Sequence, residues 1–141
     1  MKEEIITHSE EETLLFAREL GKKSKKGDVF ALTGDLGAGK TIIAKGIAGG
    51  INVVDDITSP TFTIMEAYDG DLPFYHFDLY RIESEEELDL LYFEEYWEGD
   101  GISVIEWAEK AGDRLPDNTT TLTLEYLDEN SRRITIEYPD H

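Results

Sequence analysis

Gly34-Asp35-Leu36-Gly37-Ala38-Gly39-Lys40-Thr41 matches the pattern G-x-x-x-x-G-K-[ST] at every fixed position. The apolar run 29–32 precedes it and predicts a buried strand, and residues 41–48 follow it and predict a helix that Gly49-Gly50 ends. Glycine permits backbone conformations closed to other residues, so successive N–H groups can surround a phosphate group. A strand, a glycine-rich loop and a helix in this order predict a phosphate-binding loop.

Each residue type of this loop suits a Mg-nucleotide. The helix that begins near Lys40 adds unpaired N–H groups and roughly half a positive charge at its N-terminus. We expect Lys40 to reach the β- and γ-phosphates and the Thr41 hydroxyl to ligate Mg²⁺. The expected nucleotide contacts are Gly34, Asp35, Leu36, Gly37, Ala38, Gly39, Lys40, Thr41 and Ile42. A dinucleotide-binding G-x-G-x-x-G loop is rejected, because residues 37–42 lack the third glycine and the Lys-Thr pair has no role there.

Two carboxylates follow apolar segments downstream of the loop. Glu106 comes directly after residues 102–105, and Asp78 comes after residues 74–77. Ligands of open α/β sheets bind outside the carboxyl ends of the strands, where such acids can hold Mg²⁺ or orient water. From spacing alone, each acid is equally consistent with an exposed strand end.

Other polar and aromatic residues near these positions leave two interpretations open. Thr61, within residues 59–63, could contact Mg²⁺ or the γ-phosphate as a switch loop does, or simply start a strand after Pro60. His76 is most simply a strand histidine. Arg81 could neutralise transition-state charge or pair with neighbouring acids, and Trp107 could stack on the base or fill the core.

The remaining sequence predicts alternating helices and strands. Ser9-Glu10-Glu11-Glu12 has the spacing of a capping box before a helix. Further helices are expected at 13–20 and 85–97, strands at 61–65, 73–79, 102–105, 120–126 and 133–138, and turns at 69–71 and 128–130. In the helix 85–97, Leu88, Leu91 and Tyr92 are expected on the apolar side, and Tyr96 is a further candidate for it. This order predicts an α/β protein with the three-layer P-loop NTPase fold, a mixed, partly parallel central sheet, and a single domain over residues 1–141.

Composition narrows the class of partner. The chain carries 32 acidic against 13 Lys and Arg residues, a formal charge of -19, which repels nucleic-acid backbones. The acids are dense from Glu83 to Asp100, either as a solvated helix face or as a docking surface for a protein. There is no cysteine, no signal-like N-terminus and no apolar run of the ~18 residues that a membrane span needs. We therefore expect a cytoplasmic protein with no membrane association.

Four segments together resemble one family. They are the loop 34–41, Ser59-Pro60-Thr61-Phe62-Thr63, Tyr75-His76-Phe77-Asp78-Leu79-Tyr80-Arg81 and Ile105-Glu106-Trp107. Their order and spacing resemble the bacterial TsaE (YjeE) ATPases of tRNA threonylcarbamoyladenosine synthesis, from about Ser9 to the C-terminal hairpin. The string His-Phe-Asp-Leu-Tyr-Arg is much more specific than the phosphate loop.

The resemblance implies an ATPase that uses Mg²⁺, binds ATP and ADP, and assists a TsaD–TsaB threonylcarbamoyl-transferase complex at adenosine 37 of tRNAs reading ANN codons. The tRNA would be met only through that complex. By motif, Thr41 and Glu106 correspond to magnesium-side residues and Asp78 to a catalytic or metal-side acid. Thr61 corresponds to a switch-like residue and Trp107 to a neighbour of the nucleotide. Candidates to frame the adenine are Glu10, Thr13 and Arg132.

The chain also departs from the family. Ile42 stands where the family often has a second Thr, so that one hydroxyl contact to phosphate is missing. The chain stops soon after the hairpin, where some relatives continue.

Three other functions are less consistent with the sequence. A small-molecule kinase of the same fold would bring several basic residues over the phosphates, and here only Arg81, Lys110, Arg114, Arg132 and Arg133 follow the phosphate-loop helix, without clustering. A GTPase would need an Asn-Lys-x-Asp string, which is absent. A non-hydrolysing scaffold would leave both Glu106 and Asp78 unexplained.

Overall fold

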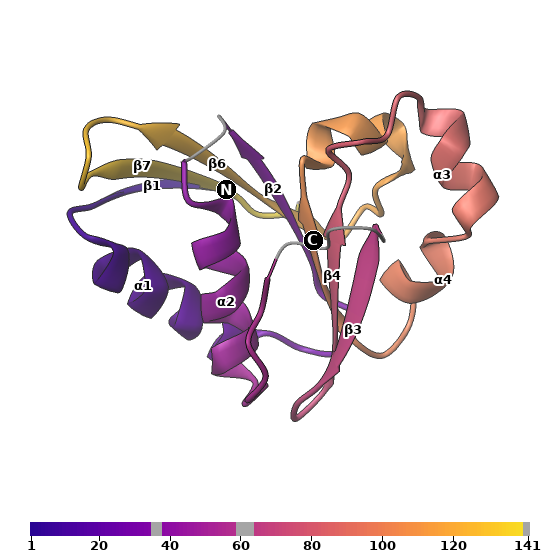
Figure 1. The fold of residues 1–141 in the computed structure, drawn as a ribbon, viewed down its shortest axis with the longest axis horizontal. Helices are drawn as coiled ribbons and strands as arrows, with labels where there is room; N and C mark the ends of the chain where they lie inside the picture. Colours follow the sequence, from indigo (N-terminus) through magenta and orange to yellow (C-terminus); the bar gives the residue numbers. More distant parts are fainter. Residues whose placement is uncertain (35–37, 59–63, 140–141) are drawn as a thin grey trace.

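The architecture is a seven-stranded mixed sheet in a computed structural model that describes residues 1–34, 38–58 and 64–139 (Figure 1). The strands lie in the order β1-β7-β6-β2-β5-β4-β3. Strands β6, β2, β5 and β4 run parallel to one another, whereas β1, β7 and β3 each pair antiparallel with a neighbour. The bounds are β1 Lys2–Thr7, β2 Val29–Gly34, β3 Met65–Asp69, β4 Pro73–Asp78, β5 Ile102–Glu106, β6 Thr119–Tyr126 and β7 Arg132–Glu137. The predicted partly parallel sheet is confirmed.

Helices cover both faces of this sheet. Helices α1 (Glu10–Lys23) and α2 (Lys40–Gly50) lie on one side, and α3 (Glu85–Leu91) and α4 (Glu94–Trp97) lie on the other (Figure 1). The 3₁₀ helix η1 (Ala108–Arg114) also belongs to the α3 side. In β2, Phe30 and Leu32 join the core under α1 and α2, and Val29 and Ala31 join the opposite core. A strand buried on both faces reads as a continuous apolar run, which is why the pattern at 29–32 predicts it.

Helices α1 and α2 touch backbone to backbone. A Cβ placed on Gly46 would lie 2.3 Å from the Ala17 Cβ, and one on Gly50 would lie 2.4 Å from the Arg18 carbonyl oxygen. Gly49-Gly50 therefore does not end the helix as predicted. Both glycines belong to α2, whose C-cap is Ile51, and the close approach of α1 requires glycine at Gly50.

The predicted helix 85–97 is wrong in its middle. Tyr92 takes a left-handed conformation with φ of 55°, which ends α3, and a separate short helix follows. Leu91 and Tyr92 are 41% and 67% exposed, so the apolar side is formed by Leu88, Phe93 and Trp97 instead. These three side chains bury against the sheet.

Other boundaries differ in detail. Strand β1 and helix η1 were not predicted. The predicted strand at 61–65 contributes Met65 to β3, and residues 61–63 lie outside the described residues. The turn between β3 and β4 and the C-terminal hairpin are confirmed. None of the described helices has the length and apolarity needed to cross a membrane.

Candidate functional site

The site is built where parallel strands end beside the start of α2. The register pairs Asp78 at the end of β4 with Glu106 at the end of β5, and Glu106 with Leu32 of β2. Gly34 ends β2 with φ of +133°, and a Cβ there would lie 2.3 Å from the Leu124 carbonyl oxygen. Glycine is thus required where the chain leaves the sheet for the loop. The geometry brings the described parts of the predicted phosphate loop, Gly34 and residues 38–41, to the same edge of the sheet as both predicted acids.

Lys40 is held inward at the first position of α2. Lys40 is only 5% exposed, and its Nζ donates a hydrogen bond of 2.8 Å to the Gly34 carbonyl oxygen. The same Nζ lies 4.0 Å from the centre of the Trp107 ring. The ammonium is therefore fixed between the loop backbone and an aromatic face.

Trp107 follows Glu106 in a left-handed conformation with φ of 58°. This backbone turns its ring over Lys40, and the Tyr80 ring packs against it with centroids 5.0 Å apart. Lys110 Nζ donates to the carbonyl oxygens of Tyr80 and Ile82 at 2.5 and 3.2 Å, so η1 holds the segment after β4 that carries Tyr80. Trp107 is partly buried and packs against the core on the α3 side, and the other contact of its ring is with Lys40.

Thr41 and Glu106 meet directly. The Thr41 hydroxyl donates to the Glu106 carboxylate, with Oγ1 at 3.1 Å from Oε1 and 3.3 Å from Oε2. On its far side, Oε2 lies 2.5 Å from Nε2 of His76. Glu106 and His76 are 3% and 0% exposed. Glu106 is therefore a buried, hydrogen-bonded carboxylate and not an exposed strand end.

Asp78 lies beside this group and is partly buried. Burial raises the pKa of its carboxyl group, and the nearby Glu106 carboxylate raises it further. A hydrogen bond of 3.0 Å from the Tyr80 backbone N–H to Oδ1 acts in the opposite direction. The result is an acid that holds its proton more tightly than an ordinary aspartate.

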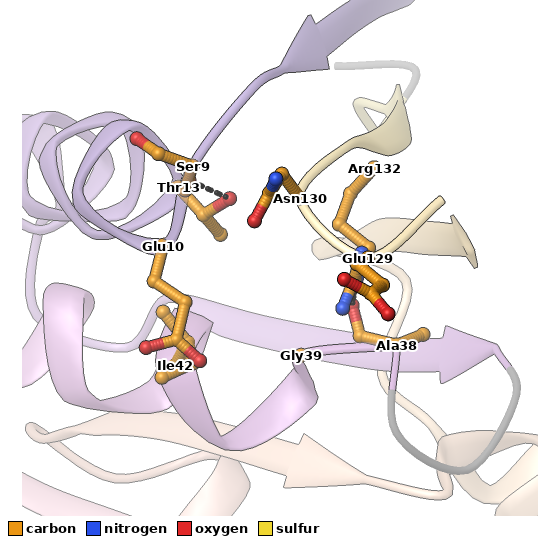
Figure 2. Close-up of a pocket in the computed structure, with 9 residues that line it drawn as sticks. All are labelled: Ser9, Glu10, Thr13, Ala38, Gly39, Ile42, Glu129, Asn130 and Arg132. Atoms are coloured by element: carbon orange, nitrogen blue, oxygen red, sulfur yellow. Dashed lines mark hydrogen bonds between the residues drawn. The ribbon is translucent and has the colours of Figure 1, made fainter. Parts of the chain in front are cut away.

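An open pocket adjoins the loop on the other side of α2's first turn (Figure 2). Figure 2 shows side chains from the start of α1, from the loop and from the β6–β7 turn facing this space. The lining residues are Ser9, Glu10, Thr13, Ala38, Gly39, Ile42, Glu129, Asn130 and Arg132. The three residues suggested by family resemblance to frame the adenine, Glu10, Thr13 and Arg132, are thus together in one pocket.

Two local structures shape this pocket. Ser9 caps α1 by accepting from the Glu12 N–H at 3.1 Å, which confirms the predicted N-cap, and the Glu12 carboxylate accepts at 2.9 Å from the N–H of His8, one residue before the cap position of a capping box. Arg132 joins the hairpin to the loop, because its Nε donates to the Ala38 carbonyl oxygen at 3.1 Å. Its guanidinium also lies 4.5 Å over the Tyr126 ring.

The donor set fits Mg²⁺. A hydroxyl and a carboxylate stand in contact at Thr41 and Glu106, with the Asp78 carboxyl on the neighbouring strand end. Hard oxygen ligands of this kind suit Mg²⁺, which commonly takes one or two protein oxygens together with waters and substrate phosphates. Over the part of the chain that the structure describes, no group of three or more acidic, His or Cys side chains could form a complete metal cage.

Some predicted residues are not tested by this geometry. Asp35, Leu36, Gly37 and Thr61 lie outside the described residues. Conversely, the sequence pattern predicts only a strand histidine at His76, although this residue contacts Glu106. A signal was available, because His76 and Asp78 are two positions apart on one strand and so share a face of the sheet.

Comparisons with known proteins agree over almost the whole chain. The family model "Threonylcarbamoyl adenosine biosynthesis protein TsaE" matches residues 7–134. The tRNA threonylcarbamoyladenosine biosynthesis protein TsaE of Treponema pallidum (strain Nichols) is 38% identical over 131 residues, covering 93% of this chain and 97% of that protein. Its counterpart in Bacillus subtilis (strain 168) is 42% identical over 131 residues, covering 92% and 82%. The crystal structure of Bacillus subtilis YdiB matches with a TM-score of 0.85 and 34% identity, covering 98% of this chain and 86% of that one.

Proposed function

Because this chain belongs to the TsaE family, a P-loop ATPase family of tRNA threonylcarbamoyladenosine biosynthesis, we propose that it binds and hydrolyses ATP with Mg²⁺ as an accessory protein of the threonylcarbamoyl-transferase complex. The modification concerned is that of adenosine 37 in tRNAs reading ANN codons. The observation that carries the ATPase part is the contact between Thr41 and Glu106 at the N-terminus of α2, beside the inward-held Lys40.

In this proposal the phosphates are bound by the loop 34–42 and by Lys40. Backbone N–H groups at the start of α2 and the Lys40 ammonium supply positive charge where the β- and γ-phosphates would lie. Lys40 has partners already in Gly34 and Trp107, so it is preorganised near the loop and needs only a local change of contact. When bound, Mg²⁺ would neutralise charge on the phosphates, with Thr41 and Glu106 as its protein-side residues.

Asp78 is assigned the role of orienting water at the phosphate edge. Its carboxyl oxygen Oδ1 accepts a hydrogen bond from the Tyr80 N–H. The neighbouring carboxylate of Glu106 is in contact with Thr41 and His76. A partly buried acid with a raised pKa beside a phosphate site is a reasonable proton acceptor or water ligand. Thr61, in the segment after α2, is proposed as a switch-like contact to the γ-phosphate or the metal.

The pocket beside the loop is the proposed place of the adenosine part. Glu10 and Asn130 offer polar groups to a base or ribose, and Arg132 lies next to the loop residue Ala38. The pocket joins the loop directly, since Gly39 and Ile42 line both. A nucleotide with its phosphates in the loop would thus have its base within reach of α1 and the β6–β7 turn.

The partner proposed is a TsaD–TsaB-type complex, which would hold the tRNA, since a chain of charge -19 repels nucleic acid. The segment 83–100, which includes α3 and α4, carries exposed acids and, among its exposed apolar side chains, Leu90 at 76% and Tyr92 at 67%. Such a face suits a protein partner with basic residues around an apolar centre. A cytoplasmic location and a single domain over residues 1–141 are part of the same proposal.

A small-molecule kinase is a weaker alternative because two of the basic residues after α2 are paired with acids away from the loop, and only Arg132 of the basic residues after α2 contacts a loop residue among the described residues. Arg114 pairs with Glu85 and Asp89, and Arg133 pairs with Glu125. Among the described residues these cations do not gather over the loop as a phosphate-covering lid would require.

The test is to measure ATP turnover by the protein alone and with the purified transferase pair, at low and high salt. We expect slow turnover alone, because no arginine cluster faces the loop among the described residues and a missing arginine finger costs about 10³–10⁵ in rate. Stimulation by the pair should weaken with salt, since exposed charges are screened over about 10 Å at 0.1 M. The double variant Glu86→Gln/Glu95→Gln should respond less to the pair than the matched control Glu11→Gln/Glu19→Gln on α1.

Two outcomes would contradict the proposal. Fast turnover by the lone protein with no response to the pair would reject the accessory role. Transfer of phosphate to a small acceptor, with no release of phosphate to water, would favour the kinase.

A further inference from the structure

His76 is the most deeply buried polar side chain near the site, and the functions proposed so far do not use it. It is 0% exposed on β4, between the buried residues Phe74 and Phe77. Its Nε2 lies 2.5 Å from Glu106 Oε2, whereas its Nδ1 finds no hydrogen-bond partner among the described residues. The imidazole therefore makes a single polar contact, and that contact is to Glu106.

The sheet dictates this contact. Phe74, His76 and Asp78 alternate along β4 and share the face that α2 covers, with Phe74 in the core on that side. Asp78 is in register with Glu106, so His76 lies one step deeper in the sheet than the carboxylate. From there the imidazole contacts Oε2 of Glu106, while the Thr41 hydroxyl, in the first turn of α2, contacts Oε1 of the same carboxylate.

The contact with Glu106 also bears on which imidazole nitrogen carries the hydrogen. An ionised carboxylate can only accept, so a hydrogen bond between His76 and ionised Glu106 requires the hydrogen on Nε2. A hydrogen on Nδ1 alone would bring an acceptor nitrogen against a carboxylate oxygen and leave a buried donor unpaired. His76 is therefore a hydrogen-bond donor to Glu106.

We propose that His76 is a positioning residue that fixes Glu106 for its role beside Thr41 and the metal. This inference rests on the proposed ATPase function. By holding Oε2, the imidazole directs Oε1 toward the Thr41 hydroxyl. The contact of that hydroxyl with Oε1 is accordingly shorter than its contact with Oε2. Residues that hydrogen-bond to a metal-ligating side chain orient that side chain in this way. Their loss typically lowers metal affinity or activity by about 10- to 100-fold.

A purely structural role explains the position less well. Burying an imidazole with one ring nitrogen unpaired is unfavourable, and an apolar side chain would occupy the buried position of His76, beside Phe74 on the α2 side of β4, at lower free energy. The contact that compensates for this burial is the hydrogen bond to Glu106. The residue type is thus accounted for by what it does to the carboxylate.

The test compares His76→Leu, which removes the donor at similar size, with His76→Gln, which can keep an N–H near the place of Nε2. Phe77→Leu is the matched control, because it alters a fully buried neighbour that faces the opposite core. For each variant, nucleotide affinity is measured by Trp fluorescence with magnesium and with EDTA, together with kcat and thermal stability. The wild-type imidazole is examined separately by long-range ¹H–¹⁵N correlation spectra, which need no nucleotide.

We expect His76→Leu to lower kcat and the magnesium-dependent part of ADP affinity by about 10- to 100-fold. Affinity in EDTA should change less than about twofold, and His76→Gln should recover much of the loss. In a Glu106→Gln background, His76→Leu should add little, because both changes act on one contact. Phe77→Leu should lower stability without changing the magnesium dependence.

The inference is overturned if His76→Leu only lowers stability, if His76→Gln is as impaired as His76→Leu, or if the spectra show Nε2 without a hydrogen. Failure of the proposed function looks different. In that case the wild type would show no magnesium-dependent nucleotide binding at all, while the Nε2 hydrogen would still be seen.

Discussion

Replacing Lys40 by methionine separates its charge from its packing. The Lys40→Met side chain would keep an unbranched stem against Trp107 but lose the ammonium that donates to Gly34 and faces the ring. The loop backbone and the start of α2 would remain. Lys45→Met is the matched control, since it removes the same charge from an exposed position on the same helix.

The expected loss of affinity is moderate because the ammonium already has partners in the free protein. Two charge-assisted contacts to phosphate contribute about 3–6 kcal/mol at about 1.5–3 kcal/mol each. Among the contacts given up, those to the Gly34 carbonyl and to the Trp107 face contribute about 2–4 kcal/mol. The difference of about 1–2 kcal/mol corresponds to roughly 5- to 30-fold in Kd. Hydrolysis should fall much further, since charge builds on the transferred group only in the transition state.

The assay is titration of ADP and of a non-hydrolysable ATP analogue, followed by Trp fluorescence, with ATP turnover measured in parallel. Normal affinity and turnover in folded Lys40→Met would reject the phosphate-loop assignment. A loss of affinity above about 10⁴-fold would instead contradict the free-state contacts, because it leaves no room for their compensation.

Three other sets of contacts give predictions of their own. Glu106→Gln and Asp78→Asn should each lower kcat by about 10²-fold or more, with ADP affinity in EDTA nearly unchanged, and normal hydrolysis by both variants would make these acids purely structural. The pKa of Asp128 lies below its usual range, because two backbone N–H groups of the hairpin turn donate to its carboxylate. Its stabilising effect should therefore be present above the ordinary aspartate pKa of about 3.9 and be lost as the pH falls through the lowered folded-state pKa. In urea unfolding, the difference between wild type and Asp128→Asn should shrink accordingly, and a pH-independent difference would show that the charge contributes nothing. Gly46→Ala should lower the free energy of unfolding by about 1–3 kcal/mol through overlap with α1. Gly49→Ala, which meets only a side-chain atom at 3.8 Å, should raise it by up to about 1 kcal/mol, and equal effects of the two changes would contradict the packing argument.

The sequence predicted the elements whose local pattern and tertiary setting agree. The run 29–32 is apolar throughout because β2 is covered on both faces, and the hairpin 120–138 has clear alternation around a turn. The helix 85–97 misled because its apolar residues fit one continuous helix, whereas Tyr92 breaks it with a left-handed residue. Strand β1 is exposed at all but one position, so no apolar pattern marks it.

The site divides in the same way. A contiguous motif made Lys40 and Thr41 predictable. The spacing of acids at strand ends identified Glu106 and Asp78 as candidates but did not decide their roles. Resemblance to a family was needed to favour those roles and to suggest Arg132. The link from His76 to Glu106 depends on the neighbour relation of β4 and β5, which follow one another in the sheet but are separated by two helices in the chain.

An acidic protein can still carry an anion site if the two kinds of charge lie on different parts of the fold. The acids that are dense between residues 83 and 100 lie around α3 and α4, on the opposite face of the sheet from α2. At the phosphate loop, the N-terminus of α2 and the buried Lys40 act at contact distance, where Coulomb energies are large and screening is weak. Glu106, the acid nearest to Thr41, is engaged by His76 and Thr41 and so stands ready as a metal-side group. The net charge of -19 then bears on which macromolecule can approach, while the binding of a small anion depends on the local charges at the loop and on the residues around it.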